Sequence, residues 1–207
     1  MYVPLVEKII PNNLNLLLVA LNGCLPTTSI NISKRCIDMA GLNLKTVLND
    51  NEVKTVIIAT TWYSNYYVDI NNIKTDKKEI KKSMDELINQ FYYYGKNVIL
   101  FSPIPIPDNN LTSKLPRKIK FGFLSKEKAL EQLSILRFKF DQQFGDINKF
   151  FEIKLKNNYI KIYNDLCDKI YCYYGKKEVM YFSDGHHIWS GALNYFSKSK
   201  NQLMQNF

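Results

Sequence analysis

The segment Val53-Lys-Thr-Val-Ile-Ile-Ala-Thr60 is the clearest strand in the sequence, because Val, Ile and Thr fill nearly all of it. A helix pattern follows it, with an apolar stripe made of Ile80, Met84, Leu87, Ile88 and Phe91. Asp76 stands at the expected start of this helix, and Gly95 stands where a left-handed residue would end it. A second apolar strand, 97–101, comes next. A strand, a helix and a strand in this order predict a right-handed crossover onto a parallel sheet.

The rest of the chain continues the alternation of helices and strands. We expect helices over 2–10, 36–48 and 125–144, the last one capped by Ser125, and strands over 14–21 and 159–163. The stretch 109–123 is predicted to be a long loop, and such loops often carry function. The predicted fold class is therefore α/β, a three-layer sandwich with a mainly parallel sheet, in one domain spanning 1–207. Ligands of such sheets bind at the carboxyl ends of the strands.

The composition is that of a globular protein. The 207 residues are 46% hydrophobic and 23% charged, which argues against disorder. The longest apolar run, 14–21, is far shorter than the roughly 20 residues that span a membrane. The amino terminus lacks the basic start and small-residue cleavage site of a signal peptide.

The formal net charge of +9 is compatible with nucleic acid, an anionic glycan or a membrane surface as partner. The lysines are spread along the helices, however, and no dense basic block alternates with aromatic residues. We therefore favour a solvated basic surface and expect no nucleic-acid partner. A basic nucleic-acid-binding α/β protein remains the alternative that charge alone supports.

The four cysteines form two close pairs, Cys24 with Cys36 and Cys167 with Cys172. Neither pair has the C-x-x-C spacing of a structural zinc site. An even number at these spacings fits two local disulfides formed in an oxidising compartment. Four buried free thiols in a cytosolic protein are the alternative.

The two histidines of the chain, His186 and His187, follow Asp184 inside the stretch 181–196. An acid shortly before a histidine, in a loop between a strand and a helix, can orient the imidazole and stabilise it when protonated. A pair of surface-loop histidines is the plain alternative. The same three side chains are too few for a well-formed metal site, so we expect no metal.

Several short motifs, taken in order, resemble the SGNH domain at the carboxyl end of membrane-bound acyltransferase-3 proteins, the O-acetylases of bacterial surface polysaccharide. The resemblance runs from near Met1 to about Phe196. The motifs are Asn22-Gly-Cys24-Leu-Pro26 with Cys36, Val56-Ile-Ile-Ala-Thr-Thr-Trp62, Gly95-Lys-Asn-Val-Ile-Leu-Phe-Ser-Pro-Ile-Pro105, Leu115-Pro116-Arg117, the Cys167/Cys172 pair, and 184–192.

This resemblance implies an SGNH-hydrolase-like (flavodoxin-like) fold and a covalent acyl-transfer mechanism. The family uses a serine from a Gly-Asp-Ser block, and a D-x-x-H element supplies the acid and the base. The D-x-x-H spacing assigns Asp184 as the orienting acid and His187 as the base, whereas counting back from Gly191-Ala192 selects His186. The implied reaction moves an acyl group, in this family acetyl, to a polysaccharide hydroxyl without a cofactor.

This sequence departs from the family pattern because it contains no Gly-Asp-Ser. The resemblance then implies that the first strand and the nucleophile elbow are missing, and that the chain by itself is inactive. A non-catalytic carbohydrate-binding or interaction remnant of the same fold is the main alternative.

Four further residues are candidates for oxyanion or substrate binding. Gly23 would offer its N–H, Trp62 would wall the acyl pocket, Asn65 is a weak substitute for the family's oxyanion asparagine, and Arg117 would meet an anionic sugar. A turn glycine, core packing and a solvated arginine are the plain alternatives for Gly23, Trp62 and Arg117. The implied partners are a glycan acceptor and a membrane acyltransferase domain that delivers the acyl donor. The implied location is periplasmic or otherwise extracytoplasmic, with membrane association through a domain not present in this chain.

Overall fold

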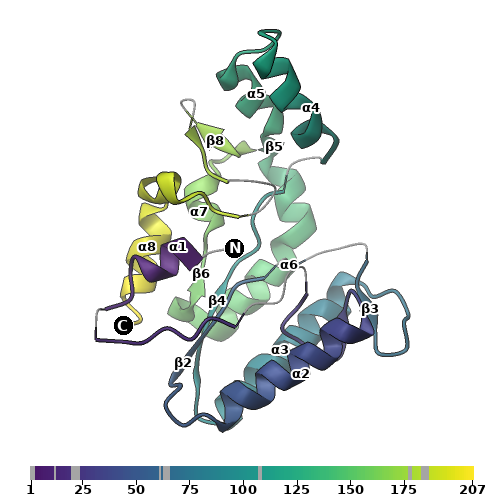
Figure 1. Ribbon diagram of the computed structural model, residues 1–207, viewed down its shortest axis with the longest axis vertical. Coiled ribbons are helices and arrows are strands. Elements are labelled where there is room, and N and C mark those ends of the chain that lie inside the picture. The colour runs from purple at the N-terminus through teal and green to yellow at the C-terminus, as the bar shows by residue number, and fades with distance from the viewer. Residues whose placement is uncertain are drawn as a thin grey trace. The chain divides into compact units, whose positions relative to one another are not determined.

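The computed structural model (Figure 1) describes residues 3–11, 13–19, 24–60, 62, 66–106, 109–176, 179–182 and 187–207. Contacts divide the chain into two units, Leu16–Phe101 and the combination of Met1–Asn15 with Ser102–Phe207. Within the described residues, no helix is long and apolar enough to cross a membrane.

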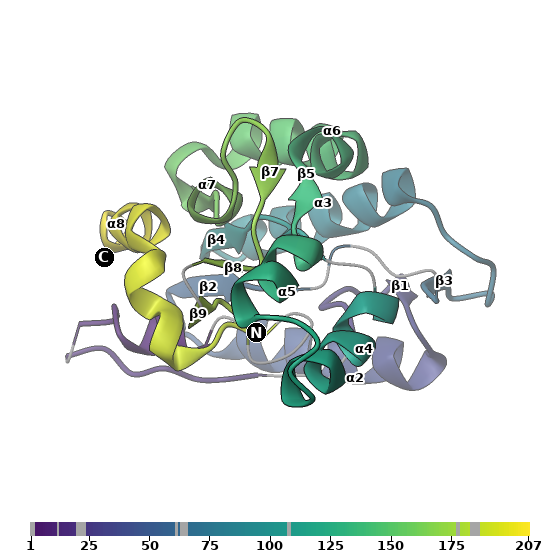
Figure 2. The same ribbon diagram turned by 90° about the horizontal axis from the view of Figure 1, so that it is seen from above.

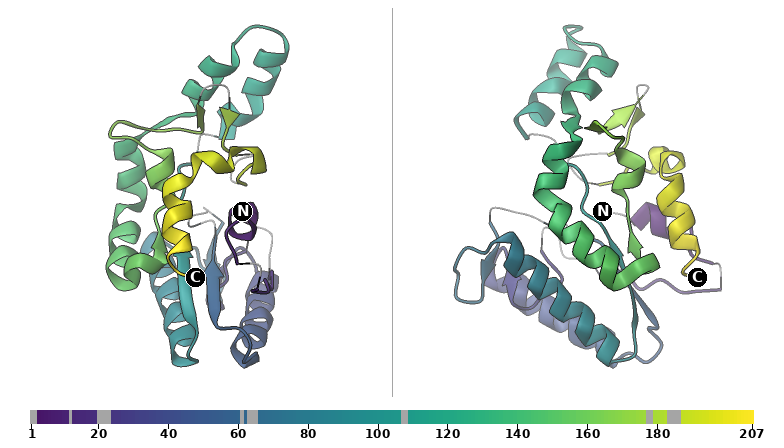
Figure 3. Two further views of the ribbon diagram at one scale, coloured as in Figure 1. Left: turned by 90° about the vertical axis from the view of Figure 1, so that its left-hand side faces the viewer. Right: turned by 180° about the vertical axis from the view of Figure 1, so that it is seen from behind.

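A parallel strand pair forms the centre of the unit Leu16–Phe101. Strand β2 (Thr55–Ile58) pairs with β4 (Asn97–Phe101), from Thr55 opposite Asn97 to Ile58 opposite Leu100. The connection between them is helix α3 (Lys77–Tyr93), as the sequence pattern predicts. Figure 3 shows β2 between α3 and α2 (Lys34–Asn49), so helices cover both faces of the pair.

Both ends of α3 follow from its sequence. The Asp76 carboxylate accepts from the Glu79 N–H while the Glu79 carboxylate accepts from the Asp76 N–H, a complete capping box. At the other end Gly95 has φ +70° and Lys96 N–H bonds back to the Phe91 carbonyl. All five predicted stripe residues are buried.

The turn after α3 also places a lysine inside the unit. The Lys96 side chain is buried, and its Nζ donates to the carbonyl oxygens of Asp50 at 2.5 Å and Val53 at 2.8 Å. These two carbonyls lie between the end of α2 and the start of β2. Lys96 therefore fastens the α2–β2 connection to the end of α3.

A short loop structure is held against α2 and α3. Strand β1 (Ile30–Asn31) pairs antiparallel with β3 (Val68–Asp69), and Cys24 is disulfide-bonded to Cys36 in α2. The buried Asn31 amide accepts from Leu25 N–H and donates to the Leu25 carbonyl. One side-chain amide thus satisfies backbone groups that this loop cannot pair within a ladder.

In the second unit, helices pack around an aromatic core. The elements are α1 (Val3–Glu7), α6 (Arg137–Leu155), η1 (Lys156–Asn158), β6 (Tyr159–Ile160), α7 (Tyr163–Leu166), η2 (Ser190–Tyr195) and α8 (Ser197–Met204). The Phe140 ring lies 5.5 Å from the Phe144 ring and 5.6 Å from the Tyr163 ring in this core. Figure 2 shows α7 beside α8. The Asp165 carboxylate of α7 caps α8, because it accepts from the backbone N–H groups of Lys198 and Ser199.

The same unit carries two hairpins. Helices α4 (Asn109–Lys120) and α5 (Lys126–Leu133) form a helical hairpin, and β8 (Gly175–Lys176) pairs with β9 (Val179–Met180). Strand β5 (Ile135–Leu136), which follows α5, pairs antiparallel with β7 (Tyr171–Cys172).

Three expectations about elements are wrong. The stretch 109–123 is mostly helix α4 and not a loop, and its inward residue Leu115 is buried. The predicted helix 125–144 is interrupted at 134–136, because those residues leave the helix to pair with β7. Its predicted cap is correct, since Ser125 accepts from Lys128 N–H. Residues 14–19 form no strand, and their large apolar side chains are exposed. A strand is stable only beside a neighbour, and these residues have no ladder partner among the described ones.

Candidate active site

The segment that carries His187 is fixed at its two ends by a narrow β-like pairing. Phe182 and Ile188 form an antiparallel bridge, and Trp189 N–H donates to the Tyr181 carbonyl at 2.9 Å. On the other side, Tyr181 N–H donates to the Tyr174 carbonyl at 3.0 Å. The hairpin β8–β9 therefore leads directly into the histidine-bearing segment.

Aromatic side chains pack around the pairing of Phe182 with Ile188. Phe182 and Ile188 are buried, and the Phe182 and Tyr174 rings lie 4.9 Å apart. Tyr181 packs against Tyr195 at 5.3 Å, and burial raises the pKa of its hydroxyl. His187, by contrast, is only half-buried. The sequence thus holds an imidazole at the edge of a packed core, where it can reach solvent.

After His187, the Trp189 indole lies over Gly191. A Cβ at Gly191 would lie 2.6 Å from ring atoms of Trp189, so a larger residue there would require this exposed indole to move. Ala192 is fully buried. Gly191 and Ala192 therefore set the path of the chain just behind the histidine. The sequence pattern located these two residues, although it indicated nothing about the contact with Trp189.

Trp62 is a core residue of the other unit. Its side chain is 2% exposed, and its indole N–H donates to the Phe101 carbonyl at 3.0 Å. The bond links the chain just beyond β2 to the last residue of β4, so it fixes the carboxyl ends of both strands. Thr60 lies at the same end, and its buried hydroxyl has no hydrogen-bond partner in the described part of the chain. Sequence reasoning missed Thr60, and the available signal was a hydroxyl residue at the carboxyl end of a predicted strand.

The remaining predicted site residues divide into two groups. Asp184, His186, Gly23 and Asn65 lie outside the described residues, so their roles stay predictions. Arg117 is exposed on the last turn of α4, whereas a loop position was expected. No group of three or more His, Cys, Asp or Glu side chains is arranged to hold a metal ion among the residues that the structure describes.

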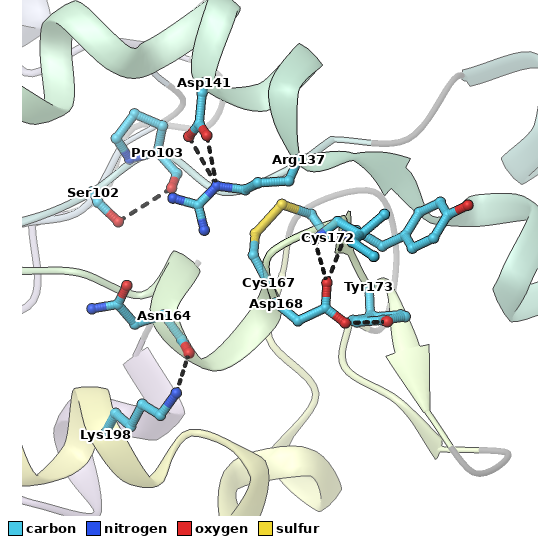
Figure 4. Close-up of a disulfide and its surroundings, with 12 residues drawn as sticks. Ser102, Pro103, Arg137, Asp141, Asn164, Cys167, Asp168, Cys172, Tyr173 and Lys198 are labelled. Atoms are coloured by element: carbon cyan, nitrogen blue, oxygen red, sulfur yellow. Dashed lines mark hydrogen bonds and ion pairs between the residues drawn. A yellow bond between two sulfur atoms is a disulfide. The ribbon is translucent and has the colours of Figure 1, made fainter.

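The second disulfide, Cys167–Cys172, closes a short loop beside Asp168 and Tyr173 (Figure 4). Inside it the Asp168 carboxylate accepts from Tyr171 N–H, the Tyr173 hydroxyl and Ile170 N–H. These donors lower the pKa of Asp168 to about 2. The hydrogen bond to Asp168 in turn raises the pKa of the Tyr173 hydroxyl to about 12. All four cysteines are therefore disulfide-bonded, in the two pairs predicted from their spacing.

Comparison with known proteins identifies the family. A family model described as "SGNH domain (fused to AT3 domains)" matches residues 1–194. The chain belongs to this SGNH family. A search of curated proteins found no match.

A solved structure supports the fold of this SGNH domain. It is the periplasmic domain of a lipopolysaccharide acetyltransferase from Salmonella ser. Paratyphi A, with a TM-score of 0.57 and 14% identity. The alignment covers 86% of this chain and 68% of that one. At this identity the likeness concerns the fold, and it confirms the predicted α/β, SGNH-like class.

Proposed function

We propose that this SGNH domain serves in the transfer of an acyl group to a hydroxyl of a surface polysaccharide. His187 is the general base and acid, with His186 the alternative, and Asp184 is its orienter. The observation that supports the proposal is the family match over 1–194, a range within which Asp184 and His187 lie. The bridge between the buried residues Phe182 and Ile188 adds support, because a catalytic imidazole must be held in position by packed neighbours.

The chemistry assigned to the histidine has two steps. The imidazole takes the proton from a serine hydroxyl, which attacks the acyl carbonyl, and then gives that proton to the departing donor group. In the second step it takes the proton of the sugar hydroxyl, a new ester bond forms, and the serine leaves with the proton restored. The carboxylate of Asp184 would stabilise the imidazolium present between these transfers.

In this proposal the serine belongs to a Gly-Asp-Ser block that these 207 residues do not contain. The chain by itself is accordingly inactive in this proposal. The exposed apolar side chains of 16–19 support it, because these residues pair with no strand in the part of the chain that the structure describes, as expected where a neighbouring strand is lacking. Such a strand, ending in the nucleophile, would cover them.

Other residues have supporting roles in the proposal. Trp62 acts through its bond to Phe101 by holding the carboxyl ends of β2 and β4, rather than by touching the substrate. Gly23 and Asn65 are candidate oxyanion donors, and Arg117 is placed in solvent where it can meet an anionic glycan. The acyl donor would reach the domain from a membrane acyltransferase domain, and two disulfides suit a periplasmic location.

The test first reads the DNA upstream of Met1 for a Gly-Asp-Ser segment, and then uses the full-length protein that contains both that segment and this chain. We expect hydrolysis of a small acetyl ester, and a loss of about 10²- to 10⁴-fold in the His187→Ala variant. His186→Ala should retain most of the activity, and Lys149→Gln, an exposed change on α6, should retain all of it. Full activity in both histidine variants would refute the assignment of a histidine base.

A second candidate is a non-catalytic glycan-binding domain of the same fold, favoured by the absence of Gly-Asp-Ser. It predicts that the 207-residue chain binds surface polysaccharide while the full-length protein lacks esterase activity. Calorimetric titration with purified polysaccharide, beside the ester assay, separates the two functions.

A further inference from the structure

The turn between α4 and α5 presents two aromatic rings to solvent. Phe121 and Phe123 are 65% and 80% exposed, and their ring centroids lie 6.4 Å apart. In Figures 1 and 3 this turn lies at the end of the helical hairpin away from the rest of its unit. Exposing two neighbouring phenyl rings to water is unfavourable in free energy, so an exposed pair of this kind indicates a site of apolar contact with a partner.

The turn is a fixed structure. Gly122 has φ +73°, and Phe123 N–H donates to the Lys118 carbonyl at 2.9 Å while Gly122 N–H donates to the Ile119 carbonyl at 3.0 Å. Ser125 then caps α5. The backbone therefore holds both phenylalanines in place at the tip.

The hairpin does not need these rings for its own packing. The buried apolar residues of the two helices are Leu115, Ala129, Leu130 and Leu133. The two phenylalanines stand outside this core, so removing them should leave the hairpin folded.

Cations on the two helices that flank the tip are here called the collar, and for this stretch the expectation that no basic block alternates with aromatic residues is wrong. The members of the collar, all exposed, are Lys114, Arg117, Lys118, Lys120, Lys126 and Lys128. Glu127 and Glu131 are the acids of the same stretch. An apolar tip inside a basic collar is complementary to an anionic bilayer, where rings enter the interface and lysines meet the phosphates.

We propose that the α4–α5 tip, Phe121 and Phe123 with its lysine and arginine collar, docks this domain onto an anionic phospholipid membrane surface. Charge alone would also fit an anionic polysaccharide or nucleic acid. The ring arrangement favours the membrane, because the rings are tilted by 46° to each other on a projecting turn and form no flat platform or groove. The family's fusion to AT3 domains supplies a reason for such contact, and the inference does not depend on the catalytic proposal.

The test is flotation of the 207-residue chain with vesicles. We expect binding to phosphatidylcholine vesicles containing phosphatidylglycerol and little binding to pure phosphatidylcholine. The Phe121→Ser/Phe123→Ser variant should partition about tenfold or more weakly, because the inserted rings supply most of the apolar gain. Tyr93→Ser and Phe138→Ser, which remove exposed rings elsewhere, are the matched controls and should bind normally.

Charge and location are tested separately. Lys118→Gln/Lys120→Gln should weaken binding about tenfold, whereas Lys45→Gln/Lys149→Gln, with the same loss of charge, should change it far less. A Phe123→Trp variant should show a blue-shifted emission on adding anionic vesicles, and Phe138→Trp should show none.

Three results would overturn the proposal. One is absence of binding to anionic vesicles by the unaltered chain. Another is binding that survives loss of both phenylalanines but is lost in Leu16→Ser/Leu18→Ser, which would move the contact to the exposed stretch 14–19. The third is binding that soluble anionic polysaccharide or DNA abolishes and that the phenylalanine variants leave unchanged, which would assign the collar to a polymer partner.

Discussion

At the scale of single residues, Trp62 shows how a residue singled out for chemistry can act through structure. Its indole N–H donates to the Phe101 carbonyl, and both residues are buried. We predict that Trp62→Phe lowers the free energy of unfolding by about 2 kcal/mol, because it removes this buried hydrogen bond and part of the packed indole. Urea unfolding measures the loss. Trp189→Phe, which alters a 45% exposed indole, should cost less than about 1 kcal/mol and is the control.

The carboxylate of Asp168 gives a pH-dependent prediction. Its pKa is about 2 in the folded chain and 3.8 ordinarily, so its contribution to stability is complete above pH 4 and is lost as the pH falls towards 2. The advantage of the unaltered chain over Asp168→Asn should therefore shrink over that interval in urea unfolding at stepped pH. An advantage that stays constant would contradict the prediction.

The partner of this carboxylate responds at the opposite end of the pH scale. The pKa of Tyr173 is raised from 10.0 to about 12, so its contribution is complete below pH 10 and is lost as the pH rises through 12. In Asp168→Asn the Tyr173 hydroxyl should ionise closer to its ordinary pKa. Tyrosinate absorbance, read as the difference from a Tyr173→Phe chain, follows that shift.

Residue types with strong local rules were predictable. Asp76 caps α3, Gly95 takes the positive φ that ends it, and the cysteines pair by proximity in sequence. The burial of Trp62 was not predictable, because it depends on where the end of β4 lies in space. Of the proposed catalytic residues, the structure describes His187 alone, and its partnership with Asp184 stays a prediction.

At the scale of elements, two glycines with different surroundings form a matched pair. A Cβ at Gly175 in β8 would clash with the Val179 carbonyl oxygen, whereas at Gly145 in α6 it would meet nothing within 4 Å. We predict that Gly175→Ala destabilises the chain by about 2 kcal/mol or more, since backbone atoms must move. Gly145→Ala should stabilise it by about 0.5–1 kcal/mol through helix propensity. Urea unfolding of both variants checks the opposite signs, and a harmless Gly175→Ala would argue against the close packing of β8 on β9.

Helices with an apolar face that repeats over several turns were predicted well. Elements that exist only because they pair with a distant segment were not. Helices α2 and α3 carry their own apolar faces and caps, so the sequence alone defines them. The break between α5 and α6 arises because 135–136 pair with β7, and no local signal announces that pairing. The stretch 14–19 has a strand's composition but no described neighbour to pair with. Local propensity is decisive only where tertiary contacts do not compete with it.

At the scale of the whole molecule, each disulfide lies within one of the two units. The Cys24–Cys36 bond closes 12 residues of chain in Leu16–Phe101, and Cys167–Cys172 closes 5 in the other unit. Loop-closure entropy predicts losses of about 3 and about 2 kcal/mol when each pair is replaced by serines. Trp62 and Trp189 lie in different units, so single-tryptophan chains report the two losses separately. Equal effects of both replacements on both tryptophans would mean that the units unfold as one.

The buried Lys96 amine, which donates to the Asp50 and Val53 carbonyls, has a practical consequence for chemical footprinting. Amine-acylating reagents can attack only amines that they can reach from solvent, so this lysine should be among the slowest in the chain to react. Acylation of Lys96 would then record transient opening of the α2–β2 connection. In mass spectrometry of timed acylation, the acylated fraction of Lys96 should increase with denaturant concentration, whereas Lys45 should react fully even without denaturant. Rapid labelling of Lys96 under native conditions would mean that the connection opens far more often than its packing suggests.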